Sequence, residues 1–154
     1  FAYHLKWDPS DLQIVGEGGF MHDIGKTKID LQILMKPDKL TDAEFSEMKK
    51  HPLMGRDILA KDNVGDEIQK IALEHHERVN GSGYPNRLSG EQISKFGKLA
   101  AIIDAYDALT TDRCFQGSVD SLNAIKILSE SSGQFDQILF DKFALLIKSE
   151  TIGK

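Results

Sequence analysis

Histidines and aspartates of the kind that bind metal ions are spread along the first half of this sequence. His22 stands directly before Asp23, His75 stands directly before His76, and His51 lies between these two pairs. Imidazole and carboxylate groups are suitable ligands for Fe, Mn, Zn and Ni. The chain has a single cysteine, which excludes a cluster of thiolate ligands. The residue types therefore predict a metal site built from nitrogen and oxygen ligands.

Two further aspartates extend this set. Asp104 and Asp107 are three residues apart, so they lie on one face if the segment is helical. A carboxylate suits a two-metal centre, because its two oxygens can bridge ions about 3.5–4 Å apart. Adjacent side chains on a helix diverge by about 100°, so His75 and His76 can share a cluster only from a helix end or by binding different metals. We assign His4 to a packed or surface position rather than to the ligand set, and composition alone leaves a structural role open for every other histidine.

Helical signals dominate the elements that must position these side chains. The predicted helices are one opened by the cluster Asp8–Asp11, one opened by the capping box Thr41–Glu44 and continuing through Phe45, Met48 and Ile58, one over Ile68–His75, one capped at Ser89–Gln92 and continuing through Leu109, and two shorter ones over Leu122–Leu128 and Ile138–Ile147. Residues 79–90 are rich in glycine and predict a loop. Strand alternation, repeats and low-complexity tracts are lacking. The sequence therefore predicts an all-α fold.

Composition limits the classes of function. The 154 residues are 40% hydrophobic and 28% charged, which is typical of a single globular domain. The formal net charge of −5 argues against binding a nucleic-acid polymer by bulk charge. The apolar runs are too short for a membrane segment, and Phe1–Asp8 lacks the features of a secretory signal. One cysteine, Cys114, fits a reducing compartment, so we expect a cytoplasmic protein.

The order of the motifs resembles that of the HD-GYP family. The first half of the resemblance consists of His22-Asp23-Ile24-Gly25-Lys26, Lys36-Pro37, Leu40-Thr41 and Met48-Lys49-Lys50-His51-Pro52 with Gly55. The second half consists of His75-His76-Glu77, Gly81-Ser82-Gly83-Tyr84-Pro85, Asp104-Ala105-Tyr106-Asp107-Ala108-Leu109-Thr110 and Arg113. The resemblance extends from about Trp7 to Phe115. It implies an HD-domain-like helical bundle in which residues 1–154 form a single HD-GYP domain.

The resemblance also implies a metal centre and an activity. The implied metal ligands are His22, Asp23, His51, His75, His76 and Asp104. They would hold two or three divalent transition-metal ions, iron or manganese first and nickel or zinc as alternatives, with Asp23 between the ions. The implied activity is hydrolysis of cyclic di-GMP to linear pGpG, and onward to GMP, in bacterial second-messenger signalling. A water activated by the metals would attack phosphorus.

Other residues acquire expected roles from the same resemblance. Asp23 and Lys26 are the expected catalytic residues, with Lys26 beside the scissile phosphate. Lys26, Tyr84 and Arg113 are the expected substrate contacts. Tyr84 either stacks on a base or plugs the core, and Arg113 would fork onto a second phosphate or a guanine edge. Glu77 is expected to hold His75 or His76 in one tautomer, and Asp107 is expected to be structural.

The chain departs from the family pattern at three places. The upstream helix that carries another histidine and often a glutamate ligand is missing, and the chain does not start with Met, so we expect a fragment of a longer protein with a sensor or receiver domain before Phe1. Asn80 replaces an aspartate before Gly81, and Gln116 replaces a basic residue.

Alternatives to this function remain open. One is hydrolysis of another cyclic dinucleotide such as cyclic GMP-AMP. A broader HD phosphohydrolase acting on nucleotides is disfavoured by Gly83-Tyr84-Pro85, an element that such enzymes lack. A different class is a catalytically weak or inactive signalling module that binds partner domains. Diguanylate-cyclase-type domains are the expected protein partners, and a homodimer is the expected assembly.

Overall fold

The computed structural model describes residues 1–111, 119–131 and 133–152, and in this part of the chain the regular elements are helices. The elements are α1 (Pro9–Met21), the 3-10 helix η1 (Ile24–Lys28), α2 (Leu31–Leu34), α3 (Asp42–Met48), α4 (His51–Lys61), α5 (Asp66–Glu74), the 3-10 helix η2 (Gly90–Gln92), α6 (Lys95–Thr110), α7 (Ser121–Glu130) and α8 (Gln137–Ile152). An isolated bridge joins Asn80 to Ser89 within the long loop. The all-α prediction is confirmed.

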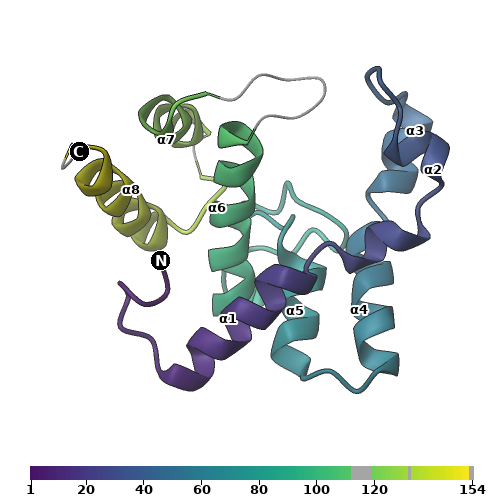
Figure 1. Cartoon of the computed structure of the whole chain (residues 1–154), viewed down its shortest axis with the longest axis horizontal. Coiled ribbons are helices and arrows are strands. Elements are labelled where there is room, and N and C mark those ends of the chain that lie inside the picture. Colours follow the sequence, from purple (N-terminus) through teal and green to yellow (C-terminus); the bar gives the residue numbers. More distant parts are fainter. Residues whose placement is uncertain (112–118, 132, 153–154) are drawn as a thin grey trace.

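Helix α5 lies at the middle of the bundle. It packs against α1, α4 and α6, while α7 and α8 pack on the other part of α6. Figure 1 shows α6 running through the centre, with α7 and α8 to its left, α1 near its lower end, and α5 and α4 to its lower right. Helix α5 ends at Glu74, so the pair His75-His76 that follows it lies between the neighbouring helices. Among the described helices, none has the length and apolar composition needed to span a bilayer.

Two apolar clusters hold these helices together. The larger one joins α6, α7 and α8 and includes Ile102, Ile125 and Phe143. The smaller one, which joins α4 and α5 and receives side chains from α1 and η1, is built on Leu59, Ile68 and Ala72. Fully burying such aliphatic or aromatic side chains contributes about 1.5–3 kcal/mol each. The smaller cluster therefore fixes the helix ends that carry the predicted metal ligands.

Glycine permits a close approach between η1 and α4. A Cβ atom at Gly25 would overlap the carbonyl oxygen of His51 and would lie 2.6 Å from the backbone nitrogen of Gly55. Any larger residue would push the two segments apart. The glycine after His22-Asp23 thus brings this pair next to the start of α4.

Two helix boundaries differ from the sequence-based prediction. The helix opened at Thr41 ends at Met48, and Ile58 lies on the separate helix α4, which begins at His51 with proline in its first turn. Proline favours a helix start because its missing N–H is not needed there. The long helix α6 is capped by Ser94, whose side chain accepts from the backbone N–H of Gly97, whereas Ser89 caps only η2. The short elements η1 and α2 were not predicted, because they contain too few residues to show the apolar spacing of a helix.

Candidate metal centre

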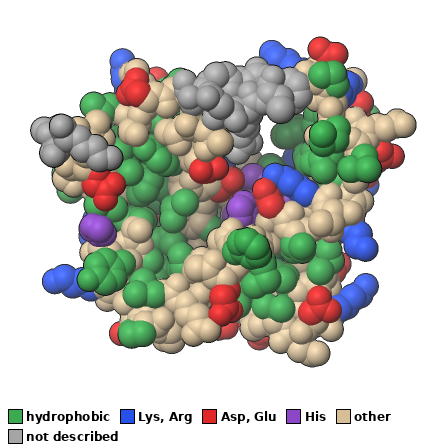
Figure 2. Space-filling view, viewed as in Figure 1, with side chains coloured by type: hydrophobic (Ala, Val, Ile, Leu, Met, Phe, Trp, Pro, Cys, Tyr) green, Lys and Arg blue, Asp and Glu red, His purple; other side chains and the backbone are tan. Residues whose placement is uncertain are grey.

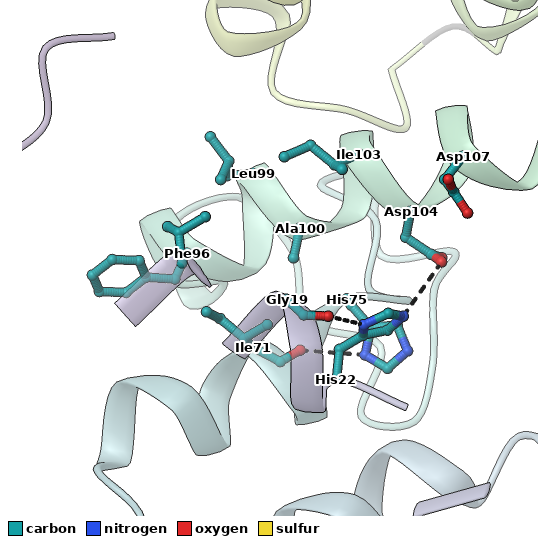
Figure 3. Close-up of a pocket in the computed structure, with 11 residues that line it drawn as sticks. Gly19, His22, Ile71, His75, Phe96, Leu99, Ala100, Ile103, Asp104 and Asp107 are labelled. Carbon is teal, nitrogen blue, oxygen red and sulfur yellow. Dashed lines mark hydrogen bonds and ion pairs between the residues drawn. The ribbon is translucent and has the colours of Figure 1, made fainter. Parts of the chain in front are cut away.

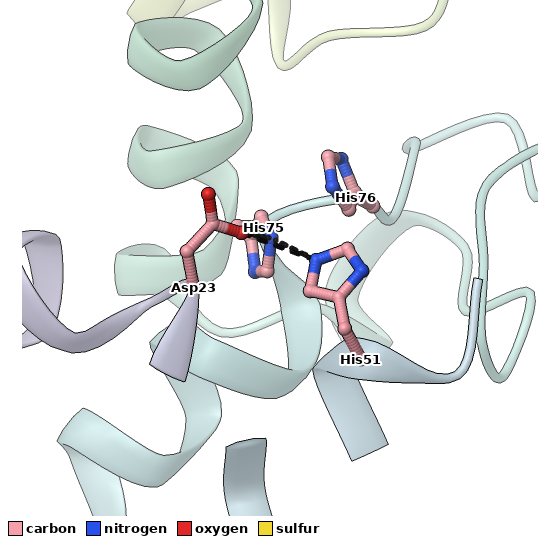
Figure 4. A group of neighbouring side chains, drawn as sticks. All are labelled: Asp23, His51, His75 and His76. Carbon is pink, nitrogen blue, oxygen red and sulfur yellow. Dashed lines mark hydrogen bonds and ion pairs between the residues drawn. The ribbon is translucent and has the colours of Figure 1, made fainter. Parts of the chain in front are cut away.

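Four of the predicted ligands form one compact group. Asp23, His51, His75 and His76 each offer a ligand atom, and these atoms lie within 4.8 Å of one another. Each residue sits at an end of a helix: Asp23 precedes η1, His51 starts α4, and the histidine pair follows α5. Figure 4 shows the four side chains pointing toward one another from these separate segments. Because His75 and His76 follow the end of α5, both rings can belong to one group, although adjacent side chains within a helix would diverge.

The backbone sets the tautomers of two of these histidines. His51 Nδ1 lies 2.7 Å from the carbonyl oxygen of Met48, and His75 Nδ1 lies 2.9 Å from that of Ala72. A carbonyl oxygen only accepts, so in each neutral ring Nδ1 carries the proton and Nε2 carries a lone pair. The two Nε2 atoms are 3.2 Å apart. Two buried lone pairs facing each other at this distance are what a bound cation would satisfy.

Asp23 completes this set of acceptors. Its Oδ1 lies 3.2 Å from His51 Nε2 and 3.7 Å from His75 Nε2. The same oxygen is buried and has no hydrogen-bond partner within the described residues. A buried carboxylate oxygen without a donor is costly unless a cation is present. The donor set, one carboxylate oxygen and two imidazole nitrogens, therefore fits a divalent transition-metal ion.

A second group lies on the other side of the Asp23 carboxylate. His22 Nδ1 lies 2.6 Å from the carbonyl of Gly19, which leaves Nε2 with the lone pair. This Nε2 lies 3.3 Å from Asp23 Oδ2 and 3.8 Å from Asp104 Oδ1. His76 Nδ1 lies 3.5 Å from Asp104 Oδ2. Asp23 Oδ1 thus faces His51 and His75 while Oδ2 faces His22, so the predicted ligands lie on both sides of one carboxylate.

The electrostatics keep Asp23 ionised. Burial by itself raises the pKa of Asp23, but polar contacts with His22, His51, His75 and Lys26 hold that pKa well below its ordinary value. Burial opposes a charge on His22 too, yet the neighbouring Asp23 carboxylate and the carbonyl of Gly19 raise its pKa.

The histidine pair is kept neutral. The pKa of His76 is lowered to about 2, mainly by burial and further by the nearby His75 and His51. Burial likewise lowers the pKa of His75. At neutral pH both rings therefore keep a lone pair, and a metal ion does not have to displace a proton from them.

Lys26 lies at the edge of the centre. Its Nζ is 2.6 Å from Asp23 Oδ2, within one turn of η1. The positive charge is therefore held beside the carboxylate that His22, His51 and His75 face. In the space-filling view, histidine and acidic side chains lie in a hollow with basic side chains next to them (Figure 2).

Tyr84 lies against a candidate ligand. Its ring is 4.7 Å from the His76 ring at an interplanar angle of 32°, and 6.5 Å from the Phe45 ring at 78°. The pKa of the Tyr84 hydroxyl is raised above its usual value, mainly by burial and further by the negative charge of Asp104. This position fits a packing role on the His76 side and leaves the predicted substrate contact untested. Arg113, the other predicted substrate contact, lies outside the described residues, as do Cys114 and Gln116.

The prediction for Glu77 was wrong. Its side chain holds the loop instead of a histidine: Oε1 accepts from the backbone N–H of Asn86 at 2.7 Å, and Oε2 accepts from that of Leu88 at 3.0 Å. The tautomer of His75 is set by carbonyls of its own helix, so no carboxylate is needed there. Gly83 permits the loop to close, because a Cβ would lie 2.6 Å from the carbonyl oxygen of His76.

We expect the variant Glu77→Gln to destabilise the protein by about 1–3 kcal/mol, because the NH2 group of this buried side chain would face one of the two backbone N–H donors and leave both without an acceptor. The free energy of unfolding in urea measures this effect. Glu91→Gln is the matched control, since Glu91 has a side chain that is 96% exposed and pairs with Lys98. Equal stability of the two variants would contradict the role of Glu77 in holding the loop.

Two other residues, Asn80 and Asp107, have clear local roles. Asn80 accepts from the backbone N–H of Ser82 at 3.0 Å and from its hydroxyl at 2.7 Å, so asparagine retains the acceptor that an aspartate would supply. Asp107 is exposed and accepts from the hydroxyl of Thr111 at 3.1 Å, which fits the structural role expected for it.

Glu74 was missed by the sequence analysis. It is 5% exposed and accepts from the backbone N–H of Ser94 at 2.9 Å and from its hydroxyl at 2.6 Å. The contact ties the end of α5, just before the histidine pair, to the start of α6, which carries Asp104. The sequence does hold an indication of this role: Glu74 lies three residues after Ile71, so its charge falls on the apolar face of the helix.

A cavity of about 330 Å³ lies next to His22 and Asp104, the second group of candidate ligands. Apolar side chains of α1, α5 and α6 line most of it, among them Val15, Ile71 and Leu99. Figure 3 shows His22 and Asp104 at one end of this cavity. The candidate metal centre therefore borders an apolar cavity.

The fold and the cluster define a helical protein that gathers imidazoles and carboxylates at its helix ends. The family model described as HD domain matches residues 1–139. This chain therefore belongs to the HD domain family, within its HD-GYP group.

Relatives agree with this assignment. A cyclic di-GMP phosphodiesterase of Pseudomonas aeruginosa is 39% identical over 139 residues, which cover 90% of this chain and 34% of the relative. A cyclic di-GMP phosphodiesterase of Vibrio cholerae is 38% identical over 149 residues, which cover 92% of this chain and 30% of the relative. A 3′3′-cGAMP-specific phosphodiesterase of the same species is 39% identical over 109 residues, with 70% of this chain and 21% of the relative covered. The chain thus spans about a third or less of these relatives.

A solved structure shares the fold. It is that of an HDG"Y"P protein from Bdellovibrio bacteriovorus, which matches with a TM-score of 0.75 at 24% identity over 92% of this chain and 45% of that protein. The match confirms the HD-GYP helical fold predicted from the sequence.

Proposed function

We propose that this chain is a metal-dependent phosphodiesterase domain that hydrolyses cyclic di-GMP to linear pGpG, and onward to GMP. The observation that carries the proposal is the Asp23 carboxylate, whose Oδ1 faces the Nε2 atoms of His51 and His75 and whose Oδ2 faces that of His22. Relatives that bear the name cyclic di-GMP phosphodiesterase support the substrate.

In this proposal the ligands divide into two sets. Asp23 Oδ1, His51 and His75 would hold one ion, with His76 beside them, and Asp23 Oδ2, His22 and Asp104 would hold a second. Iron or manganese is the expected metal, with nickel or zinc as alternatives, and a third ion is compatible with the family resemblance. When bound, the ions supply an activated water and positive charge beside the phosphoryl oxygens.

The residues of the chain have separate tasks in the reaction. Asp23 keeps the two ligand sets adjacent, and the neutral His75 and His76 leave their lone pairs free. Lys26 would turn from Asp23 to a phosphoryl oxygen and stabilise the negative charge that shifts in the transition state. Water adds to phosphorus, the bond from phosphorus to the 3′ oxygen breaks, and a proton of the water ends on that oxygen. The products are a 5′ phosphate and a 3′ hydroxyl.

Turnover by the full-length protein tests the function. The protein, loaded with iron(II) or manganese(II) under reducing conditions, should convert cyclic di-GMP to pGpG, as measured by chromatography of the nucleotides. Tight binding of cyclic di-GMP without any product would contradict the proposal and favour an inactive signalling module. Hydrolysis of 3′3′-cGAMP in preference to cyclic di-GMP would favour the second candidate, which a relative of that name supports.

Other predictions accompany this proposal. We expect residues 1–154 to form a single HD-GYP domain that works beside a sensor or receiver domain. Binding to diguanylate-cyclase-type domains, homodimer formation and a cytoplasmic location also stay predictions.

A further inference from the structure

A series of aromatic rings leads from the metal centre to the surface. The Tyr84 ring lies 4.7 Å from the ring of the candidate ligand His76, and the Phe45 ring lies 6.5 Å from that of Tyr84. Phe45, on α3, is 46% exposed. The rings therefore reach from the candidate centre to a side chain that is open to solvent.

A positive charge lies next to the outer ring. The Nζ atom of Lys49 is 4.9 Å from the centroid of Phe45. The neighbouring Lys50 instead pairs with Glu47 at 2.5 Å. Two consecutive lysines thus have different surroundings, and Lys49 is the one placed against an aromatic ring.

Exposure alone does not distinguish Phe45, since single exposed apolar side chains are common on protein surfaces. Phe20 on α1 is 92% exposed and is an example. What distinguishes Phe45 is the combination of an aromatic neighbour that contacts a candidate ligand and a cation beside its ring. This combination matches a purine, which offers a flat π surface for stacking and, in guanine, two acceptors, N7 and O6, along one edge.

We propose that Phe45, Tyr84 and Lys49 form a subsite that binds one purine base of the cyclic dinucleotide while a phosphate of the same molecule lies at the metal centre. This inference rests on the proposed function and adds two residues, Phe45 and Lys49, to the predicted substrate contacts. Phe45 supplies the stacking surface, and Lys49 donates to the acceptor edge of guanine.

Kinetics of Phe45 variants of the full-length protein test the subsite. Phe45→Leu keeps an apolar side chain but removes the aromatic surface, and it should raise KM for cyclic di-GMP about tenfold. Its kcat and its metal content should stay within twofold of wild type. Phe45→Trp restores an aromatic surface and should bring KM within threefold of wild type. Phe20→Leu is the matched control and should leave KM unchanged.

The lysine pair gives a second, independent comparison. Lys49→Met should raise KM for cyclic di-GMP about fivefold, from the loss of one base-edge contact. Lys50→Met should leave it unchanged. An unchanged KM in Phe45→Leu, or an equal effect of Lys49→Met and Lys50→Met, would overturn the subsite.

Two further outcomes separate the causes of failure. If Phe45→Leu lowers kcat and metal content together, Phe45 supports Tyr84 and His76 and the base-binding role is wrong. If wild type produces no pGpG, the proposed function fails, and the dissociation constants of cyclic di-GMP for wild type and Phe45→Leu still decide the subsite. A tenfold difference supports it, and equal values overturn it.

Discussion

Asp23→Asn should lower kcat for cyclic di-GMP by at least about a thousandfold. An amide keeps one oxygen, loses the negative charge and turns an NH2 group toward one set of imidazoles, so at least one metal ion should be lost as well. Stabilisation by bound metal in the transition state contributes several kcal/mol, and about 4 kcal/mol corresponds to a thousandfold change in rate. Single-turnover kinetics with metal analysis of the same sample measures both effects.

Asp107→Asn is the matched control for this variant. Asp107 lies three residues after Asp104 on α6, is exposed, and accepts from the hydroxyl of Thr111. Its replacement should leave kcat within about threefold of wild type. A full complement of metal in Asp23→Asn, with more than a tenth of the wild-type rate, would contradict the central place of Asp23.

Removal of metal should abolish turnover and lower the melting temperature of the domain by about 5–10 °C. At a free metal concentration of 100 times Kd, binding stabilises the folded state by about 2.7 kcal/mol, and each kcal/mol shifts Tm by about 2–4 °C in a domain of this size. The physical reason is that His51 Nε2, His75 Nε2 and Asp23 Oδ1 are acceptors that face one another. Calorimetry of the full-length protein, with chelator and after addition of metal, measures the shift.

Histidine variants show whether the shift arises at the proposed centre. His51→Ala removes a side chain that is 1% exposed and should abolish the shift on metal addition. His4→Ala removes an exposed histidine outside the predicted ligand set and should retain it. A melting temperature that is the same with and without metal, or a shift that survives in His51→Ala, would rule out this site.

The helices were largely predictable from local signals. Capping residues such as Thr41 and the apolar spacing of residues 68–75 are local features, and the structure confirms both helices. The break between α3 and α4 was missed because Met48 and Ile58 fit one continuous apolar pattern. The structure shows the break, because a new helix begins at His51 with proline in its first turn.

The candidate site was predictable in its members but not in its geometry. The order of the motifs identified His22, His51 and Asp104, yet no spacing shows that the two oxygens of Asp23 face different imidazoles. That arrangement depends on how α1, α4, α5 and α6 pack. Glu77 was assigned wrongly for the same reason, because the path of the loop, which is a tertiary feature, decides which donors reach its carboxylate.

Anomalous diffraction from crystals of the metal-loaded full-length protein, recorded at the iron and manganese edges, tests the central claim most directly. We expect two peaks at the Asp23 carboxylate, one shared with His51 and His75 and the other shared with His22 and Asp104. A single ion bound away from His51, or metal-loaded crystals without anomalous signal at Asp23, would contradict the account.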